Sequence, residues 1–262
     1  MTLTLGRDTA GELLRLWRTR RRLSQLELSL RADTSTRHLS FVETGRSQPS
    51  REMVLRLCDV LDVPLRERNH VLLAGGYAPV FAERSLGETS MGPARDAVRR
   101  ILTGHDPYPA IVVDRNWTLL DANASASVLL QGVDADLLEG EVNVLRVSLH
   151  PRGLAPNIVN LPEWRSHLLH RLRHQADWSG DPQTVALHAE LLDYPGGEAL
   201  PTSGDAPWIA VPLRLRFGDT ELSFITTVAT FGTPLDVTIS ELAIESFFPA
   251  DDATARLLPQ LV

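Results

Sequence analysis

The sequence predicts two domains of different class: an all-α domain over residues 1–76 and an α+β domain over residues 93–262, joined by a linker over 77–92. Before the linker, apolar residues recur at helical spacing between capping residues, whereas β-prone runs alternate with helices after it. Charge divides in the same way. Residues 1–80 hold 13 arginines and 9 acidic residues, and the rest of the chain holds 13 arginines and 24 acidic residues.

The first two helices are indicated by their apolar positions and a cap. A helix over 8–21 is predicted to turn four apolar side chains inward: Leu13, Leu14, Leu16 and Trp17. Ser24 can cap the next helix while Glu27 reaches back to the backbone of Ser24, which is the capping-box pattern. Leu26 and Leu30 repeat at helical spacing in this second helix, and Leu26 is expected in the core.

Three more helices complete a five-helix N-terminal domain. The third is predicted over 36–43, with Ser35 as its N-cap and Gly45 as its stop. The fourth follows the cap Ser50, and the fifth covers about 65–74. The core positions expected in the third and fourth helices are Leu39, Val42, Val54, Leu57, Cys58 and Leu61.

The second domain combines helices with strands. Helices are predicted over about 93–102, after the cap Asn123 and over 160–176, and strands over 110–114, 117–121, 208–217, 221–231 and 236–248. The turn residues Gly218, Asp219 and Thr220 predict a hairpin between two long strands. A sheet packed by helices can enclose a mostly apolar pocket, and an ordinary filled core is the alternative. The side chains expected to face inward are Val112, Leu119, Phe224, Ile225 and Phe231.

Residues 24–43 form two short helices joined by a tight turn, which is the pattern of a DNA-binding helix-turn-helix. In that motif the second helix lies in the major groove, where base pairs present distinguishable donors and acceptors. Helix pairs also occur in bundles that bind no nucleic acid, so spacing alone leaves a non-DNA-binding interaction protein as an alternative. The exposed face of the second helix offers Thr36, Arg37, His38, Ser40 and Phe41.

The residues of this motif resemble the xenobiotic-response-element (XRE) family of bacterial regulators, which includes phage repressors and Cro. The resemblance covers residues 7–74 and rests on three runs: Leu23-Ser24-Gln25, Ala32-Asp33-Thr34-Ser35 and Glu43-Thr44-Gly45-Arg46-Ser47-Gln48-Pro49-Ser50. Asp33 replaces the usual Gly of the family but tolerates a left-handed turn. The DNA-binding residues that the motif and the resemblance imply together are Gln25, Ser35, Thr36, Arg37, His38, Ser40 and Phe41, with Arg46 and Ser47 on phosphates.

Strings in the second domain resemble the MmyB-like regulators, so the resemblance extends over nearly the whole chain. They are HDPYPA at 105–110, NVLR at 143–146, HPRGL at 150–154, FGTPLDVT at 231–238 and ESFFPAD at 245–251. This resemblance implies a PAS-like sensor domain, and fatty-acid-like ligands are associated with such domains.

The ligand-binding residues predicted in this domain are Val112, Leu119, Leu145, Arg146, His150, Phe224 and Phe231. Arg146 and His150 are the candidates to meet an anionic headgroup, because a guanidinium fork suits a carboxylate. The alternative is that both are ordinary surface charges.

Three histidines suggest a different function. His167, His170 and His174 share one stripe of a helix, and imidazole is a common metal ligand, so a metal-responsive regulator is the alternative. Arg171 and Arg173 beside them oppose a cation, and no carboxylate occupies the stripe. We therefore predict neither a metal nor another cofactor.

The remaining expectations concern function class, partners and compartment. Motifs of nucleophilic catalysis and of phosphate binding are absent, so we expect no enzyme. The one cysteine excludes an internal disulfide framework, and without a signal peptide or an apolar span we expect a cytoplasmic protein with no membrane partner. We expect a regulator that binds double-stranded operator DNA, as a homodimer because one recognition helix reads few base pairs, and whose second domain binds a small apolar or fatty-acid-like ligand.

Overall fold

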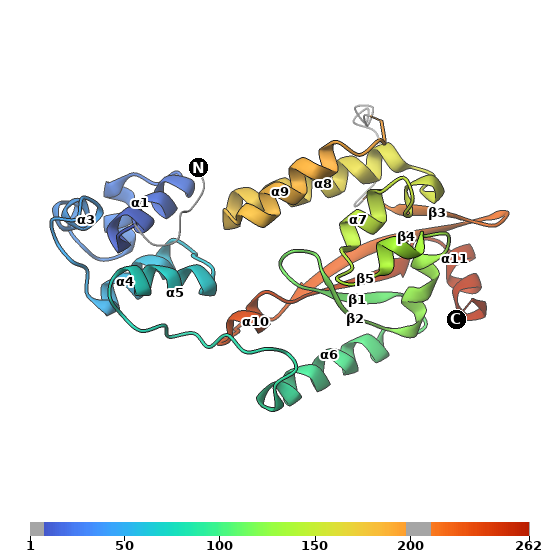
Figure 1. The fold of residues 1–262 in the computed structure, drawn as a ribbon, viewed down its shortest axis with the longest axis horizontal. Coiled ribbons are helices and arrows are strands. Elements are labelled where there is room, and N and C mark those ends of the chain that lie inside the picture. Colours follow the sequence, from blue (N-terminus) through green and yellow to red (C-terminus); the bar gives the residue numbers. More distant parts are fainter. Residues whose placement is uncertain (1–7, 198–210, 262) are drawn as a thin grey trace. The chain divides into compact units, whose positions relative to one another are not determined.

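A computed structural model of the chain describes residues 8–197 and 211–261, and it confirms the predicted fold class (Figure 1). Five N-terminal helices precede an α+β region with one five-stranded antiparallel sheet. By its internal contacts the chain forms two compact units. The head unit consists of Met1–Arg84, Asp177–Pro182 and Pro234–Ser240, and the body unit consists of Ser85–Ala176, Gln183–Thr233 and Glu241–Val262.

Three of the five N-terminal helices begin at the caps that the sequence predicts. The five helices are α1 (Ala10–Arg20), α2 (Gln25–Arg31), α3 (Thr36–Glu43), α4 (Arg51–Val60) and α5 (Leu65–Ala74). The side chains of Ser24, Ser35 and Ser50 each accept a hydrogen bond from the first turn of their helix, and Ser24 forms the predicted capping box with Glu27. Helix α1 starts later than expected because Thr9 caps it.

The core of the head unit holds the predicted residues of α3 and α4, but α2 packs on a different face. Leu39, Val42 and Cys58 are fully buried, whereas Leu26 is 58% exposed and Leu30 is 72% exposed. The prediction of Leu26 in the core was wrong. Helical spacing marks the members of one face, but it does not decide which face packs, and α2 buries Leu28 and Ser29 instead.

Two backbone features let these short helices approach one another. Asp33 has φ of +48° and Gly45 has φ of +72°, so both turns around α3 pass through the left-handed region as predicted. Helix α1 carries Gly11, where a Cβ atom would overlap the carbonyl oxygen of Val42 in α3. A larger residue at Gly11 would therefore push these two helices apart.

The body unit is built on a sheet with the strand order β2-β1-β5-β4-β3, and every neighbouring pair is antiparallel. The strands are β1 (Ala110–Val113), β2 (Leu119–Ala122), β3 (Leu213–Phe217), β4 (Thr220–Thr230) and β5 (Ala243–Pro249). The hairpin predicted at Gly218 joins β3 to β4. The predicted start of β3 at residues 208–210 lies outside the described residues.

Two details of the strand prediction were wrong. The segment expected as one strand over 236–248 begins with the short helix α10 (Val237–Ser240), because the Asp236 carboxylate accepts from the backbone N–H of Thr238 and starts a turn. Ile225 is 41% exposed and does not face inward. Successive residues of a strand point to opposite faces, so Ile225 has to lie on the face opposite its buried neighbour Phe224.

Helices and short 3-10 segments cover the sheet. The α-helices are α6 (Gly92–Gly104), α7 (Val144–Leu149), α8 (Leu161–Ser179), α9 (Pro182–Leu192) and α11 (Asp252–Leu257). The segments after Asn123 and in the loops are 3-10 helices: η1 (Thr89–Met91), η2 (Ala124–Leu130), η3 (Ala135–Leu138), η4 (Ala155–Asn157) and η5 (Leu258–Gln260). Helices α8 and α9 run alongside each other in Figure 1, and Arg165 of α8 donates to the carbonyl of Leu192 at the end of α9. Among the residues described, no helix is both long enough and apolar enough to cross a bilayer.

Candidate functional site

Helix α3 is held to the rest of the head unit by one face. Leu39 and Val42 are buried under it. At its first turn, the hydroxyl oxygens of Thr36 and Ser29 lie 2.9 Å apart and share a hydrogen bond. The opposite face of α3 therefore remains at the surface, which is the orientation that groove binding requires.

A buried carboxylate ties α1, α2 and α3 together. Glu43 at the end of α3 is only 2% exposed, and it accepts hydrogen bonds from Arg18 Nε at 2.6 Å, Arg18 Nη2 at 2.8 Å and Gln25 Nε2 at 2.8 Å. The bond to Glu43 raises the pKa of Arg18 above its ordinary value, so this guanidinium stays charged. Gln25 thus has a structural role in the head unit, and its contact with DNA stays a prediction.

The surface of α3 and the following turn presents two cations around one aromatic ring. The guanidinium carbons of Arg37 and Arg46 lie 5.4 Å and 5.9 Å from the ring centre of Phe41. Both arginines are exposed, and cation–π contacts of this kind restrain a long side chain without neutralising it. Two such guanidinium groups can donate to phosphates or to base edges. The other predicted DNA-binding residues on α3 or at its ends are Ser35, Thr36, His38, Ser40 and Ser47.

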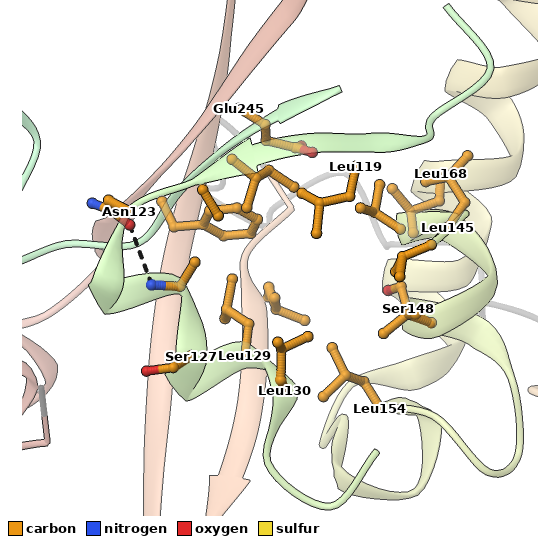
Figure 2. A pocket seen from close by; sticks show the side chains of 18 of the residues that line it. Leu119, Asn123, Ser127, Leu129, Leu130, Leu145, Ser148, Leu154, Leu168 and Glu245 are labelled. Atoms are coloured by element: carbon orange, nitrogen blue, oxygen red, sulfur yellow. Dashed lines mark hydrogen bonds between the residues drawn. The ribbon is translucent and has the colours of Figure 1, made fainter. Parts of the chain in front are cut away.

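The body unit encloses a cavity of about 330 Å³ between the sheet, η2, α7 and α8. Figure 2 shows its ring of mainly aliphatic side chains. The apolar lining residues are Ile111, Leu119, Ala122, Ala124, Ala126, Leu129, Leu130, Val142, Val144, Leu145, Val147, Leu154, Trp164, Leu168, Leu213 and Phe247. This volume and this lining are typical of a site for a small apolar molecule.

Four polar residues also line the cavity: Asn123, Ser127, Ser148 and Glu245. Each of them bonds to another group of the protein. The Asn123 Oδ1 accepts from the Ala110 N–H at 2.9 Å and its Nδ2 donates to the Tyr108 carbonyl at 2.8 Å, while Ser127 donates to the Ala124 carbonyl at 2.8 Å. Ser148 accepts a hydrogen bond from Trp164 Nε1 at 3.0 Å.

Among the described residues of this lining, Glu245 of β5 is the one that carries a charge, and it is 5% exposed. Its Oε1 accepts from Arg171 Nη1 at 2.9 Å, and the guanidinium carbon of Arg171 lies 4.3 Å from the ring centre of Trp117. Trp117 has φ of +66°, an uncommon conformation for a bulky residue, and its Nε1 donates to Gln175 at 2.9 Å. Burial raises the pKa of Glu245, while Arg171 acts in the opposite direction.

The cavity includes only part of the predicted ligand set. Leu119 and Leu145 line it, whereas Val112, Arg146, His150, Phe224 and Phe231 do not. Val112 and Phe224 are core residues, and Phe224 packs edge-to-face on Phe247. Phe231 is half-buried just beyond the end of β4.

The two predicted headgroup residues have partners outside the cavity. Helix α7 turns Val144, Leu145, Val147 and Ser148 toward the cavity, so Arg146 points away from it. The Arg146 guanidinium instead donates twice to Glu190, each time at 2.8 Å, and His150 packs edge-to-face on Tyr194. Sequence reasoning missed Glu245, although a charge between Ile244 and Phe247 in an apolar strand was a usable signal.

The three histidines of the α8 stripe differ in their surroundings. His170 and His174 are exposed, while His167 is half-buried against Trp164, and burial with the nearby charge of Arg171 lowers the pKa of His167. Across residues 8–197 and 211–261 there is no group of three or more His, Cys, Asp or Glu side chains placed to hold a metal ion.

The family comparison assigns the second domain. Residues 94–261, which are more than half of the chain, match the family described as the MmyB-like transcription regulator ligand binding domain. The chain belongs to the MmyB-like transcription regulators. Residues 9–71 match a helix-turn-helix domain, so this MmyB-like regulator combines a DNA-binding domain with a ligand-binding domain. Neither matched family is an enzyme family.

Other comparisons give weaker likenesses to this MmyB-like regulator. One solved structure is the clp gene regulator ClgR from Corynebacterium glutamicum, at 23% identity over 37% of this chain and 90% of that chain, with a TM-score of 0.23. Another is an RNA-binding Light-Oxygen-Voltage receptor, at 15% identity over 97% of this chain and 64% of that chain, with a TM-score of 0.25. The search of curated proteins gave no match.

Proposed function

We propose that this MmyB-like regulator binds operator DNA through α3, and that a small apolar or fatty-acid-like ligand in the body unit changes its affinity for the operator. The observation that carries the proposal is the cavity of about 330 Å³ with its almost wholly apolar lining. Each methylene buried there contributes about 0.8 kcal/mol, so a chain of moderate length can bind without any ion pair.

The DNA-binding part of the proposal rests on the exposed face of α3. We propose that Arg37 and Phe41 on this face meet base edges and that Arg46, which follows the helix, meets a phosphate; their position around one exposed aromatic ring supports this. Glu43 fixes this helix to α1 and α2, so its exposed side chains are presented on a rigid support. We expect homodimers, because paired heads read two half-sites of an operator.

The remaining parts of the proposal concern the extent and class of the domains. We infer a DNA-binding domain over 1–76, a linker over 77–92 and a PAS-like ligand-binding domain over 93–262, and the family matches at 9–71 and 94–261 support these limits. The antiparallel strand order β2-β1-β5-β4-β3 supports the PAS-like class. A regulator of this kind acts where the DNA is, so we propose a cytoplasmic protein.

A ligand changes operator affinity only if it binds the DNA-competent and the DNA-incompetent arrangements with different affinity. The test therefore needs two measurements on the same protein. A preferred operator is first selected from a random duplex library, and the full chain is then titrated onto it with and without decanoic acid or 1-decanol.

We expect native mass spectrometry to detect the probe on the protein and the operator Kd to shift when the probe is present. Ala126→Phe, which fills the cavity, should abolish both effects while leaving operator binding without probe unchanged. The proposal of a ligand sensor fails if neither probe binds, and the proposal of regulation fails if a probe binds but the operator Kd stays the same.

A further inference from the structure

The cavity of the body unit has a polar edge formed by the carboxylate of Glu245. Glu245 is almost fully buried, and its carboxylate borders a space that is otherwise walled mainly by apolar side chains. Oε1 accepts from Arg171, but no hydrogen bond from the described chain reaches Oε2. An ionised carboxylate has room for about four hydrogen bonds, so Glu245 retains accepting capacity on the cavity side.

The charge of this site is already balanced within the protein. Arg171 faces Glu245 at 2.9 Å and is held against the indole of Trp117, so the pair is neutral as a whole. A ligand carboxylate here would lie beside that of Glu245, and a ligand ammonium would lie close to the guanidinium of Arg171. Either charged headgroup would lose its hydration without gaining a counter-ion of its own, because Glu245 and Arg171 already pair with each other.

A neutral hydroxyl group meets neither obstacle. It donates one hydrogen bond to Glu245 and adds no charge, while an alkyl chain fills the aliphatic part of the cavity. Figure 2 shows Glu245 at one edge of the ring of side chains, with Leu119, Leu168 and Leu145 between it and Ser148 in this view. A headgroup at Glu245 thus leaves apolar walls for the rest of the molecule.

We propose that Glu245 accepts a hydrogen bond from the ligand, and that the ligand is an apolar chain ending in a neutral hydroxyl group rather than in a carboxylate. This inference rests on the proposed function, because it requires that the cavity binds a ligand. A hydrogen bond donated to Glu245 also favours its charged form, which counteracts the rise in its pKa that burial causes.

The test compares headgroups on one chain length. Binding of 1-decanol, decanoic acid, decylamine and methyl decanoate to the full chain is measured by isothermal titration calorimetry at neutral pH. We expect 1-decanol to bind about tenfold more tightly than methyl decanoate, which cannot donate, and more tightly than both charged probes.

Variants at Glu245 assign this preference to its carboxylate. In Glu245→Leu the advantage of 1-decanol over methyl decanoate should disappear, while Glu245→Gln, which keeps an acceptor oxygen, should retain part of it. Glu190→Gln is the matched control, since Glu190 also pairs with an arginine but lies outside the cavity, and it should leave the ranking unchanged. Glu245→Met combined with Arg171→Met replaces Glu245→Leu if the loss of one charge prevents folding.

The outcomes separate the two proposals. If decanoic acid or decylamine binds most tightly, if all probes bind equally, or if Glu245→Leu keeps the preference for the alcohol, the hydroxyl proposal is overturned and the ligand-binding function stands. If no probe binds, the ligand-binding function itself is overturned, and the hydroxyl proposal with it.

Discussion

The head unit and the body unit each contain a buried glutamate paired with an arginine, and the two pairs differ in how completely they are bonded. Glu43 accepts three hydrogen bonds that occupy both of its oxygens, whereas one hydrogen bond is found for Glu245 within the described chain. Glu43 is enclosed by protein, but Glu245 borders a cavity. The comparison teaches that burial alone does not make a charge a candidate for ligand binding, and that unused bonding capacity beside a cavity makes Glu245 the better candidate of the two.

The largest expected effect tests the structural side of this comparison. Glu43→Ala leaves the Arg18 guanidinium without its buried partner, and we expect the head unit to lose about 3–5 kcal/mol of stability. Hydrogen exchange measured by mass spectrometry should show faster exchange in α1, α2 and α3, while β5 keeps its protection. Gln25→Ala removes one of the three bonds and should cost about 1 kcal/mol. Equal effects of the two substitutions would contradict a network centred on Glu43.

Filling the cavity tests the functional side. Ala126→Phe places a large ring among the lining residues, and we expect 1-decanol affinity to fall by about 100-fold or more, because most of its methylenes lose their place. Val112→Phe is the matched control, since Val112 is equally buried but does not line the cavity. It should destabilise the body unit by about 1–3 kcal/mol through overpacking, and the remaining folded protein should still bind the probe. Calorimetry and thermal unfolding of both variants decide between these outcomes.

The surface of α3 gives the next effect. Arg37→Ala should lose about 1–3 kcal/mol on the preferred operator and relax one base position, if this arginine donates to guanine. Arg46→Ala should weaken all DNA sequences alike and reduce the slope of log K against log salt by about one unit, as a phosphate contact does. Titration of specific and random duplexes at several salt concentrations separates the two roles, and identical losses would remove the assignment of α3 to the groove.

The smallest effect concerns an exposed pair. Arg146→Ala breaks the bonds to Glu190, and we expect a stability loss below about 1 kcal/mol at neutral pH with no change in ligand affinity. The hydrogen bond from Arg146 lowers the pKa of Glu190 below its ordinary value of 4.5. This stabilisation is therefore present above pH 4.5 and is lost as the pH falls through the lower folded pKa. Urea unfolding between pH 3 and 7 should show a shallower acid loss in the variant, and weaker probe binding would return Arg146 to the ligand site.

The parts of the fold that were predictable are those set by neighbours in sequence. Ser24, Ser35 and Ser50 cap their helices through bonds to residues three positions later, so each cap can be recognised locally. The left-handed turn at Asp33 could likewise be predicted from its local sequence. The predictions that Leu26 and Ile225 are buried were wrong, because periodicity defines a face but does not determine whether another element packs on it.

The cavity was less predictable because its walls come from distant parts of the chain. Leu119 and Leu145 were identified, but Ala126, Trp164 and Glu245 join them only after the sheet and α8 come together. Arg146 was predicted to contact an anionic headgroup because its charge suits a carboxylate, but the angular spacing of residues in α7 points its side chain away from the cavity. The body helix α9 was not predicted, although Leu187 and Leu191 repeat at helical spacing on its buried face.

The stacking of Trp117 on Arg171 has a practical consequence. Indole emission responds to charges close to the ring. The Arg171 guanidinium, which stacks on Trp117, also bonds to the Glu245 carboxylate that borders the cavity. Trp164, which lines the cavity, is a second indole whose surroundings a bound ligand would change. We therefore expect a ligand that enters the cavity to change the tryptophan emission of the unlabelled protein during a titration.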